Sequence, residues 1–284
     1  MRYESPTTTK EAVTLLSREK GKAHILAGGT DLLVRLRMDM IEPDLMVDIK
    51  RIPAMNEIKK TPAGAFKVGA AVSGIRLGAN KALTKAWPGV VEATNLIGSD
   101  QIQGRCTMVG NLCNASPAAD SVPALIAAGA KANVVGKKRR TVAVEDIATG
   151  PGKTSLAKGE IIESITLPKR PPKSGDAYLR FIPRTEMDIA VVGVAISLTL
   201  KKGVVASARV ALGAVAATAL LVPEAAKAII GSKLDDDALD ALAAACSAAC
   251  KPIDDKRGTV EYRTKVAGVL ARRAAKIAFE RAGG

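Results

Sequence analysis

The sequence predicts an α+β protein of two domains. Helical and strand-like periodicities alternate over roughly the first 167 residues, and a segment rich in proline and charge, "PKRPPKSGDA" at 168–177, then interrupts them. Strand-like segments followed by helices fill the remainder. With 284 residues and 48% hydrophobic content, the chain can bury one large core or two ordinary ones. We therefore predict a linker, and a domain boundary, at 168–177.

The first part of the chain reads as short helices and strands in alternation. Apolar spacing predicts helices at about 10–20, 31–40, 73–83, 88–98 and 123–130. Strand-like runs lie at 24–27, 45–49, 65–71, 132–136, 140–147 and 160–167, and 52–58 reads as a loop. Residues 105–120 show neither a helical nor a strand period, and so long an irregular segment in a compact domain is usually functional.

The second part predicts an antiparallel meander and then helices. Strands are expected at about 178–182, 189–201 and 204–213, the last two joined by the turn "KKG" at 201–203. Helices are expected at 223–230, 235–250 and 258–282. In the last helix the predicted buried stripe is Val266, Val269, Leu270, Ala274 and Ile277.

Composition excludes several classes of function. No apolar run reaches the roughly 18 residues of a membrane span, and the polar start has no signal-peptide core, so we expect a cytoplasmic protein. The four cysteines form no CxxC pair and the chain has a single histidine, His24, so we expect no metal site. Cys246 and Cys250 are interpreted as small buried apolar residues.

The net charge of +14 is compatible with an anionic partner or cofactor. The basic residues are spread along the chain, however, and aromatic platforms for bases are nearly absent, so we expect no nucleic-acid binding. The one dense basic cluster, "GKKRR" at 136–140, lies between two strand-like runs and is interpreted as a solvated hairpin turn.

The stretch "AGGTD" at 27–31 predicts an anion-binding turn between a strand and a helix. Gly28 and Gly29 can adopt backbone angles that other residues avoid, and their N–H groups can converge on one anion. Thr30 can hydrogen-bond a phosphate oxygen. The alternative is a plain turn in which Thr30 is only the N-cap of the next helix.

A second candidate loop lies within "RCTMVGNLCNASPAAD" at 105–120. It contains Gly110, the polar side chains of Thr107, Asn111, Asn114 and Ser116, and Asp120. Two such loops would suit two linked phosphates. Asp120 either accepts hydrogen bonds from cofactor hydroxyls or is a helix-dipole partner. Because neither loop matches GxGxxG or GxxxxGK[ST], the residues alone indicate a phosphorylated or diphosphate ligand and no more.

At these residues the chain resembles the FAD-binding, medium subunits of the molybdenum hydroxylases, such as aerobic carbon monoxide dehydrogenase and xanthine dehydrogenase types. The motifs, in order, are "AGGTDLL" (27–33), "TMVGNLCNASPAADSVPAL" (107–125), "YLRFIPRTEMDIAVVGVA" (178–195), "VALGAV" (210–215) and "PIDDKRGTVEYR" (252–263). The resemblance spans the whole chain. It implies a PCMH-type FAD-binding domain at 1–170, with subdomains of about 1–55 and 56–170. A C-terminal domain with a three-stranded antiparallel sheet and a helical bundle would follow at 177–284.

The resemblance also implies the site residues, all of them cofactor-binding and none catalytic. These are Ala27, Gly28, Gly29, Thr30, Asp31, Leu32, Thr107, Met108, Val109, Gly110, Asn111, Asp120 and Arg180. Two positions depart from the family pattern. Val109 stands where relatives often have glycine, and Arg180 stands where many have lysine, which keeps the charge but changes its geometry.

The activity implied is that of an oxidoreductase subunit. FAD, held non-covalently, would receive electrons from a small [2Fe-2S] subunit and pass them to an external acceptor, while a large molybdenum–pterin subunit oxidises the substrate. A dimer of heterotrimers is expected. The alternative is a stand-alone FAD-dependent oxidase or reductase acting on its own substrate, which would need catalytic side chains for which the C-terminal domain offers few candidates.

Overall fold

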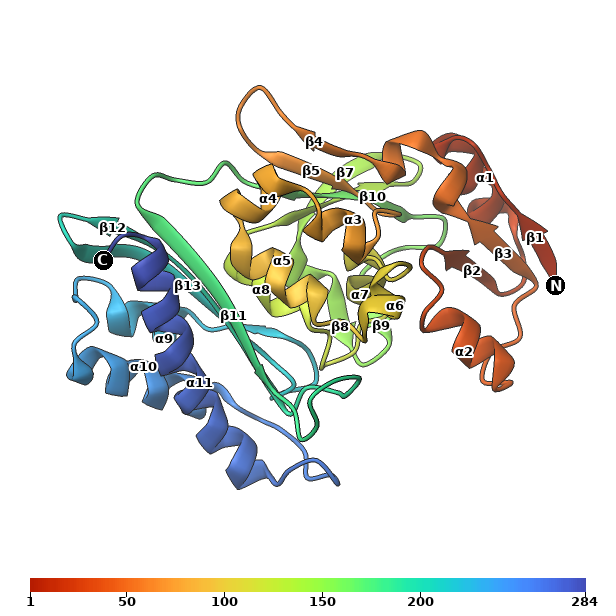
Figure 1. Ribbon diagram of the computed structural model, residues 1–284. Coiled ribbons are helices and arrows are strands. Elements are labelled where there is room, and N and C mark those ends of the chain that lie inside the picture. Colours follow the sequence, from red (N-terminus) through yellow and green to blue (C-terminus); the bar gives the residue numbers. More distant parts are fainter.

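The computed structural model describes all 284 residues, which form three sheets packed side by side with helices between them (Figure 1). The first sheet is parallel, in the order β1-β3-β2. Its elements are β1 (Arg2–Glu4), α1 (Thr9–Arg18), β2 (Ala23–Leu26), α2 (Leu32–Arg37) and β3 (Leu45–Asp48). A capping box begins α1, because the Thr8 hydroxyl accepts from the Glu11 N–H and the Glu11 carboxylate accepts from the Thr8 N–H. The predicted strand, glycine turn and helix at 24–40 are confirmed, although the helix ends at Arg37.

The second sheet has five antiparallel strands in the order β4-β5-β10-β6-β7. Its strands are β4 (Ile58–Lys60), β5 (Phe66–Gly69), β6 (Lys131–Val135), β7 (Arg139–Ala143) and β10 (Ile161–Leu167). Short helices lie between them: η1 (Ile49–Arg51), η2 (Pro53–Asn56), α3 (Gly74–Gly78), α4 (Lys81–Ala86), α5 (Pro88–Asn95), α6 (Asp100–Gln103), α7 (Met108–Cys113), α8 (Ser121–Ala127) and η3 (Val144–Asp146). The strands β8 (Ala148–Gly150) and β9 (Lys153–Thr154) form a separate small hairpin. The sheet and these helices share one hydrophobic core.

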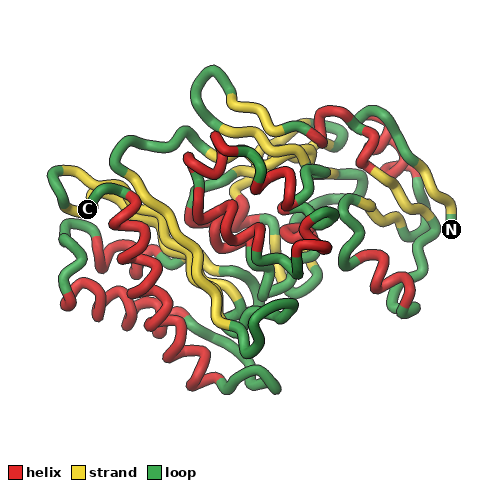
Figure 2. Tube along the Cα trace, viewed as in Figure 1, coloured by secondary structure: helices red, strands yellow, loops and turns green.

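The third sheet is antiparallel and carries a helical layer on its outer face (Figure 2). Its elements are β11 (Ser174–Phe181), β12 (Val192–Lys201), β13 (Val204–Gly213), β14 (Leu220–Leu221), α9 (Pro223–Ile229), α10 (Asp236–Ala249) and α11 (Val260–Arg281). Tyr178, Ala195 and Ala211 are paired across three strands and pack into the core of the preceding part. Their neighbours Ala177, Ile196 and Val210 belong to a second core with α9–α11. This sheet therefore separates the two cores.

Four predictions about elements are corrected by the structure. Residues 105–120 are not wholly irregular, because α7 lies within them, and the helix predicted at 73–83 is broken into α3 and α4. The predicted linker at 168–177 ends early, since β11 begins at Ser174. A fourth, two-residue strand, β14, extends the predicted three-stranded sheet.

The predicted buried stripe of α11 is wrong at Val269, which is 40% exposed. The helix instead buries small residues: Ala267, Gly268, Ala271, Ala274, Ala275 and Ala278. The reason is close packing against β11, where a Cβ on Gly175 would overlap the carbonyl oxygen of Ala278. Only small side chains allow the backbones of a helix and a strand to approach so closely.

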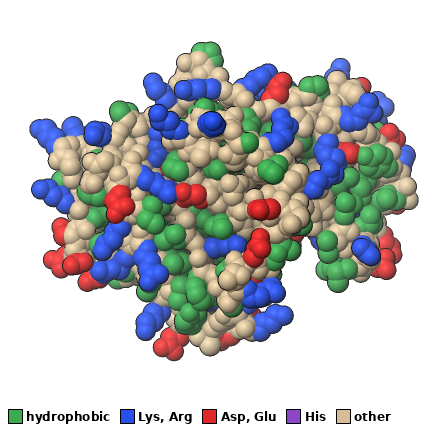
Figure 3. Space-filling view, viewed as in Figure 1, with side chains coloured by type: hydrophobic (Ala, Val, Ile, Leu, Met, Phe, Trp, Pro, Cys, Tyr) green, Lys and Arg blue, Asp and Glu red, His purple; other side chains and the backbone are tan.

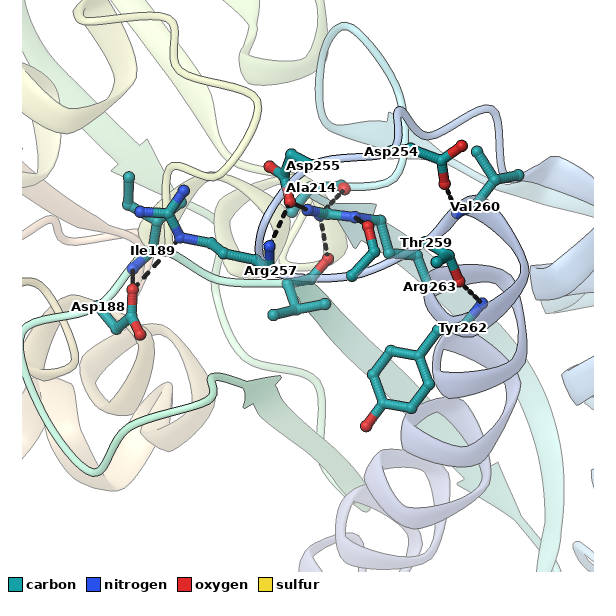
Figure 4. A network of polar contacts seen from close by, with 12 residues as sticks. Asp188, Ile189, Ala214, Asp254, Asp255, Arg257, Thr259, Val260, Tyr262 and Arg263 are labelled. Atoms are coloured by element: carbon teal, nitrogen blue, oxygen red, sulfur yellow. Dashed lines mark hydrogen bonds and ion pairs between the residues drawn. The ribbon is translucent and has the colours of Figure 1, made fainter.

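The motif at 252–263 ties the start of α11 to the sheet (Figure 4). Arg263 is buried, and its guanidinium donates to the Val191 carbonyl (2.8 Å) and to the Asp255 carboxylate (2.7 Å). Arg257 pairs with Asp188 in the loop before β12 (3.4 Å). The motif is therefore structural in this chain. No helix of the molecule combines the length and the apolar character needed to cross a membrane.

Candidate functional site

A cavity with the features of a ligand site lies where the first two sheets meet. Its volume is about 540 Å³, within the range of ~300–1,000 Å³ that is usual for cofactor sites. Three segments form its walls: the turn after β2, the start of α7, and the residues between β8 and β10. The cavity therefore brings together both glycine loops that the sequence singled out.

The first loop lies directly against the second. A Cβ on Gly28 would overlap the carbonyl oxygen of Arg105, so only glycine permits this approach. Gly29 has a φ of +79°, in the left-handed region. No hydrogen bond inside the chain uses the N–H groups of residues 28–32, and these five donors are available to a ligand at the cavity wall.

The alternative of a plain turn in which Thr30 is the N-cap of the next helix is not supported by the cap geometry. The N-cap position of α2 is Asp31, and no side chain makes a capping hydrogen bond there. The first backbone N–H groups of this helix thus have no hydrogen-bond partner in the chain. A bound anion would accept hydrogen bonds from them.

The second loop forms the first turn of α7. The Thr107 hydroxyl accepts from the Gly110 N–H at 2.9 Å and caps this helix. The Met108 and Val109 N–H groups have no partner within the chain. Val109 is buried and lines the cavity, which keeps its volume of about 540 Å³ with this side chain in place. Of these two residues only Val109 lines the cavity, so its N–H is a further donor at the cavity wall.

Polar side chains link the two loops. The Asn114 amide donates to the Asp31 carboxylate at 3.3 Å. Burial raises the pKa of Asp31, although the nearby Arg35 guanidinium opposes the shift. Asn111, which also lines the cavity, accepts from the Ser121 N–H (3.1 Å) and hydroxyl (2.7 Å) at the start of α8.

Asp120 and Arg180 form an ion pair that lies outside the cavity. Arg180 Nη1 lies 2.8 Å from Asp120 Oδ2, and the Tyr178 hydroxyl donates to Asp120 Oδ1 at 3.0 Å. Burial raises the pKa of Asp120 to about 6, against the opposing charge of Arg180. Its carboxylate makes no capping bond to α8, so its partners come from β11 and not from the helix that it precedes.

The structure brings together ten of the thirteen predicted residues around the cavity. They are Ala27, Gly28, Gly29, Thr30, Asp31, Leu32, Thr107, Val109, Gly110 and Asn111. Met108, Asp120 and Arg180 do not line it, and Met108 has its side chain in the core.

Sequence reasoning missed the third wall altogether. It consists of Gly152, Thr154, Leu156, Ala157, Lys158, Gly159, Glu160, Ile161 and Ile162. Part of it was read only as a strand, and "GPGKTS" at 150–155 was the one signal of a turn there. His24 and Arg35 also line the cavity.

The two cysteines at the cavity do not have the character of nucleophiles or metal ligands. Burial raises the pKa of Cys106 to about 11 and that of Cys113 to about 12. Both thiols therefore stay protonated near neutral pH. What the cavity offers a ligand is a set of backbone donors, suited to an anion.

Comparison with known proteins agrees with this site. Residues 1–170 match the family model described as the FAD binding domain in molybdopterin dehydrogenase, and residues 177–278 match that of the CO dehydrogenase flavoprotein C-terminal domain. The chain is 33% identical to the carbon monoxide dehydrogenase medium chain of Afipia carboxidovorans, covering 99% of this chain and 97% of that one. It is 29% identical to the nicotine 6-hydroxylase medium subunit of Paenarthrobacter nicotinovorans, covering 96% and 95%.

A solved structure extends the comparison to three dimensions. The carbon monoxide dehydrogenase of Hydrogenophaga pseudoflava contains a chain that superposes with a TM-score of 0.95 at 31% identity, over 99% of this chain and 98% of that one. The family models together cover almost the full length, and the relatives match from end to end. The chain therefore belongs to the family of FAD-binding medium subunits of the molybdenum hydroxylases.

Proposed function

We propose that this chain holds FAD non-covalently in the cavity between its two N-terminal sheets and relays electrons within a molybdenum hydroxylase complex. FAD can accept electrons one at a time and release them as a pair, which is the chemistry that a relay between iron–sulfur clusters and an external acceptor needs. The observation that carries the proposal is the convergence of two glycine loops, with their unused backbone N–H groups, on one cavity.

The residues fit the diphosphate of FAD. The free N–H groups of residues 28–32 and of Met108 and Val109 would donate to phosphate oxygens. The absence of a side chain at Gly28 lets the two loops approach each other, so that both sets of donors reach the same anion. Arg35 and Lys158 add positive charge at the wall of the cavity.

Asp120 and Arg180 are proposed to contact the part of the cofactor that extends past Asn111. Ser121, the neighbour of Asp120, is hydrogen-bonded to Asn111 at the cavity wall. The ion pair is buried and held by Tyr178, so it presents a fixed charge distribution. Met108 is proposed to contribute only its backbone.

The partners proposed are a large molybdenum–pterin subunit and a small [2Fe-2S] subunit, assembled as a dimer of heterotrimers. The names of the relatives support a multisubunit enzyme, since they are medium chains. We also propose that the FAD-binding domain ends near residue 170 and that the complex works in the cytoplasm, where the four free thiols would remain reduced.

Titration of the flavin-free chain with FAD tests the cofactor assignment. We expect saturable binding, absorption bands near ~370 and ~450 nm, and a rise in melting temperature equivalent to about 3 kcal/mol at a hundredfold excess over Kd. FMN, which lacks the diphosphate, is the matched control and should bind at least tenfold more weakly. A melting temperature that ignores added FAD would remove the ligand from the site.

A further inference from the structure

The third wall of the cavity is a strap, defined here as residues 152–160. Its first part is fixed by backbone hydrogen bonds. The Gly152 N–H donates to the Ala115 carbonyl (3.0 Å), and the Ser155 N–H donates to the Ile147 carbonyl (2.8 Å). These bonds tie the strap to residues that lie just after α7 and η3.

The second part of the strap, residues 156–160, makes no backbone hydrogen bond to another part of the chain. Glu160 Oε2 accepts from the Ala157 N–H at 2.8 Å, so the turn is closed on itself. Leu156, Lys158 and Glu160 line the cavity from this turn. The position of the wall at this end therefore depends on side chains.

The side chain of Arg140 connects residues 156–160 to another part of the chain. Its Nε lies 2.8 Å from Glu160 Oε1 and its Nη2 lies 2.7 Å from Glu160 Oε2, a two-pronged pairing in which guanidinium and carboxylate planes match. The same Nη2 also donates to the Ser155 carbonyl at 3.2 Å. No other side chain from outside the strap hydrogen-bonds to it.

Gly159 is the point at which the strap approaches α1. Gly159 is buried and has a φ of +82°, and a Cβ there would overlap the hydroxyl of Ser17 in α1. The strap thus approaches α1 at Gly159 and pairs with the Arg140 guanidinium of β7 at Glu160.

We propose that Arg140 is a positioning residue of the cofactor site, which fixes the strap as its third wall through Glu160 and so retains FAD. Arg140 does not line the cavity itself. Its neighbour Arg139 points to a different carboxylate, Glu163 (3.0 Å), which also lies outside the cavity. Of the two adjacent arginines in the basic run at 136–140, only Arg140 thus pairs with a residue that lines the cavity. The inference rests on the FAD assignment above.

The test compares the rate of FAD dissociation from the full-length chain in four forms: wild type, Arg140→Ala, Arg140→Lys and Arg139→Ala. We expect Arg140→Ala to dissociate FAD about tenfold faster, and Arg140→Lys to lie between it and the wild type because an ammonium cannot pair two-pronged. Arg139→Ala, the matched control, should stay within twofold of the wild type.

Trypsin provides a second readout, because residues 156–160 contain one exposed cleavage site, after Lys158, whereas the other lysine of the strap, Lys153, lies in β9. With FAD present, we expect Arg140→Ala to be cut at Lys158 faster than the wild type, with the other sites unchanged. Cleavage throughout the chain would identify global unfolding, and equal rates in all four forms for both readouts would overturn the inference. If the wild type itself bound no FAD, the proposed function would fail first.

Discussion

Gly28 carries the most specific structural requirement of the proposed site. Its Cα faces the backbone of Arg105 and Cys106, with no room for a methyl group. We predict that Gly28→Ala forces the two loops apart, weakens FAD binding at least tenfold and lowers the free energy of unfolding by about 1–3 kcal/mol. Isothermal titration and chemical denaturation measure the two effects.

Gly104→Ala is the matched control for that substitution. Gly104 lies next to the same loop, its φ is −61°, and a Cβ there would be 3.4 Å from its nearest neighbour, an ordinary contact. The control should bind FAD as the wild type does. Equal FAD affinities of the Gly28 and Gly104 variants would show that the contact between the loops does not matter for the cofactor.

The buried carboxylate of Asp120 should make the stability of the folded chain depend on pH. Burial raises its pKa from 3.8 in the unfolded chain to about 6 in the folded one. Between these values the folded state binds the proton more tightly, so the wild type should lose stability relative to Asp120→Asn as the pH rises from about 4 to about 6. The loss is at most about 3 kcal/mol.

Denaturation of both proteins at several pH values checks this prediction. Asp176, whose pKa burial also raises to about 6, is common to the two chains and cancels in the difference. If the wild type instead gained stability relative to Asp120→Asn as the pH rises through this window, the Arg180 guanidinium would lower the pKa of Asp120 more than burial raises it.

Among secondary-structure elements, those with a long period or strong end signals were predicted well. The strand, glycine turn and helix at 24–37 carry their own boundaries, and the meander of β11–β13 follows from β-branched residues and a "KKG" turn. The helix α7 was missed because six residues that include Gly110 and Asn111 show no apolar period. The two-residue strand β14 is too short to leave any pattern.

The presence or absence of a local sequence signal also decides which parts of the site could be predicted. Glycine loops are local signals, so ten cavity residues could be named from the sequence together with the family resemblance. The strap has no such signal, because its role comes from an arginine some twenty residues earlier in the chain. Likewise, the ion pair of Asp120 and Arg180 joins the residue before α8 to a residue of β11 that is 60 positions away, which no local spacing in the sequence reveals.

In the whole molecule, the third sheet separates two hydrophobic cores, and the cavity proposed for FAD is lined only by residues that precede this sheet. Figure 3 shows lysines and arginines dispersed over the visible face, with acidic side chains among them. No residue of the third sheet or of α9–α11 lines this cavity.

The central claim is that electrons pass through the flavin held by this chain. The most direct test is rapid-mixing spectroscopy of the purified complex, reduced through its iron–sulfur clusters, with and without FAD. We predict that flavin bleaching follows cluster reduction, and that removing FAD stops transfer to the external acceptor while the clusters are still reduced. Undiminished transfer to that acceptor by the flavin-free complex would contradict it.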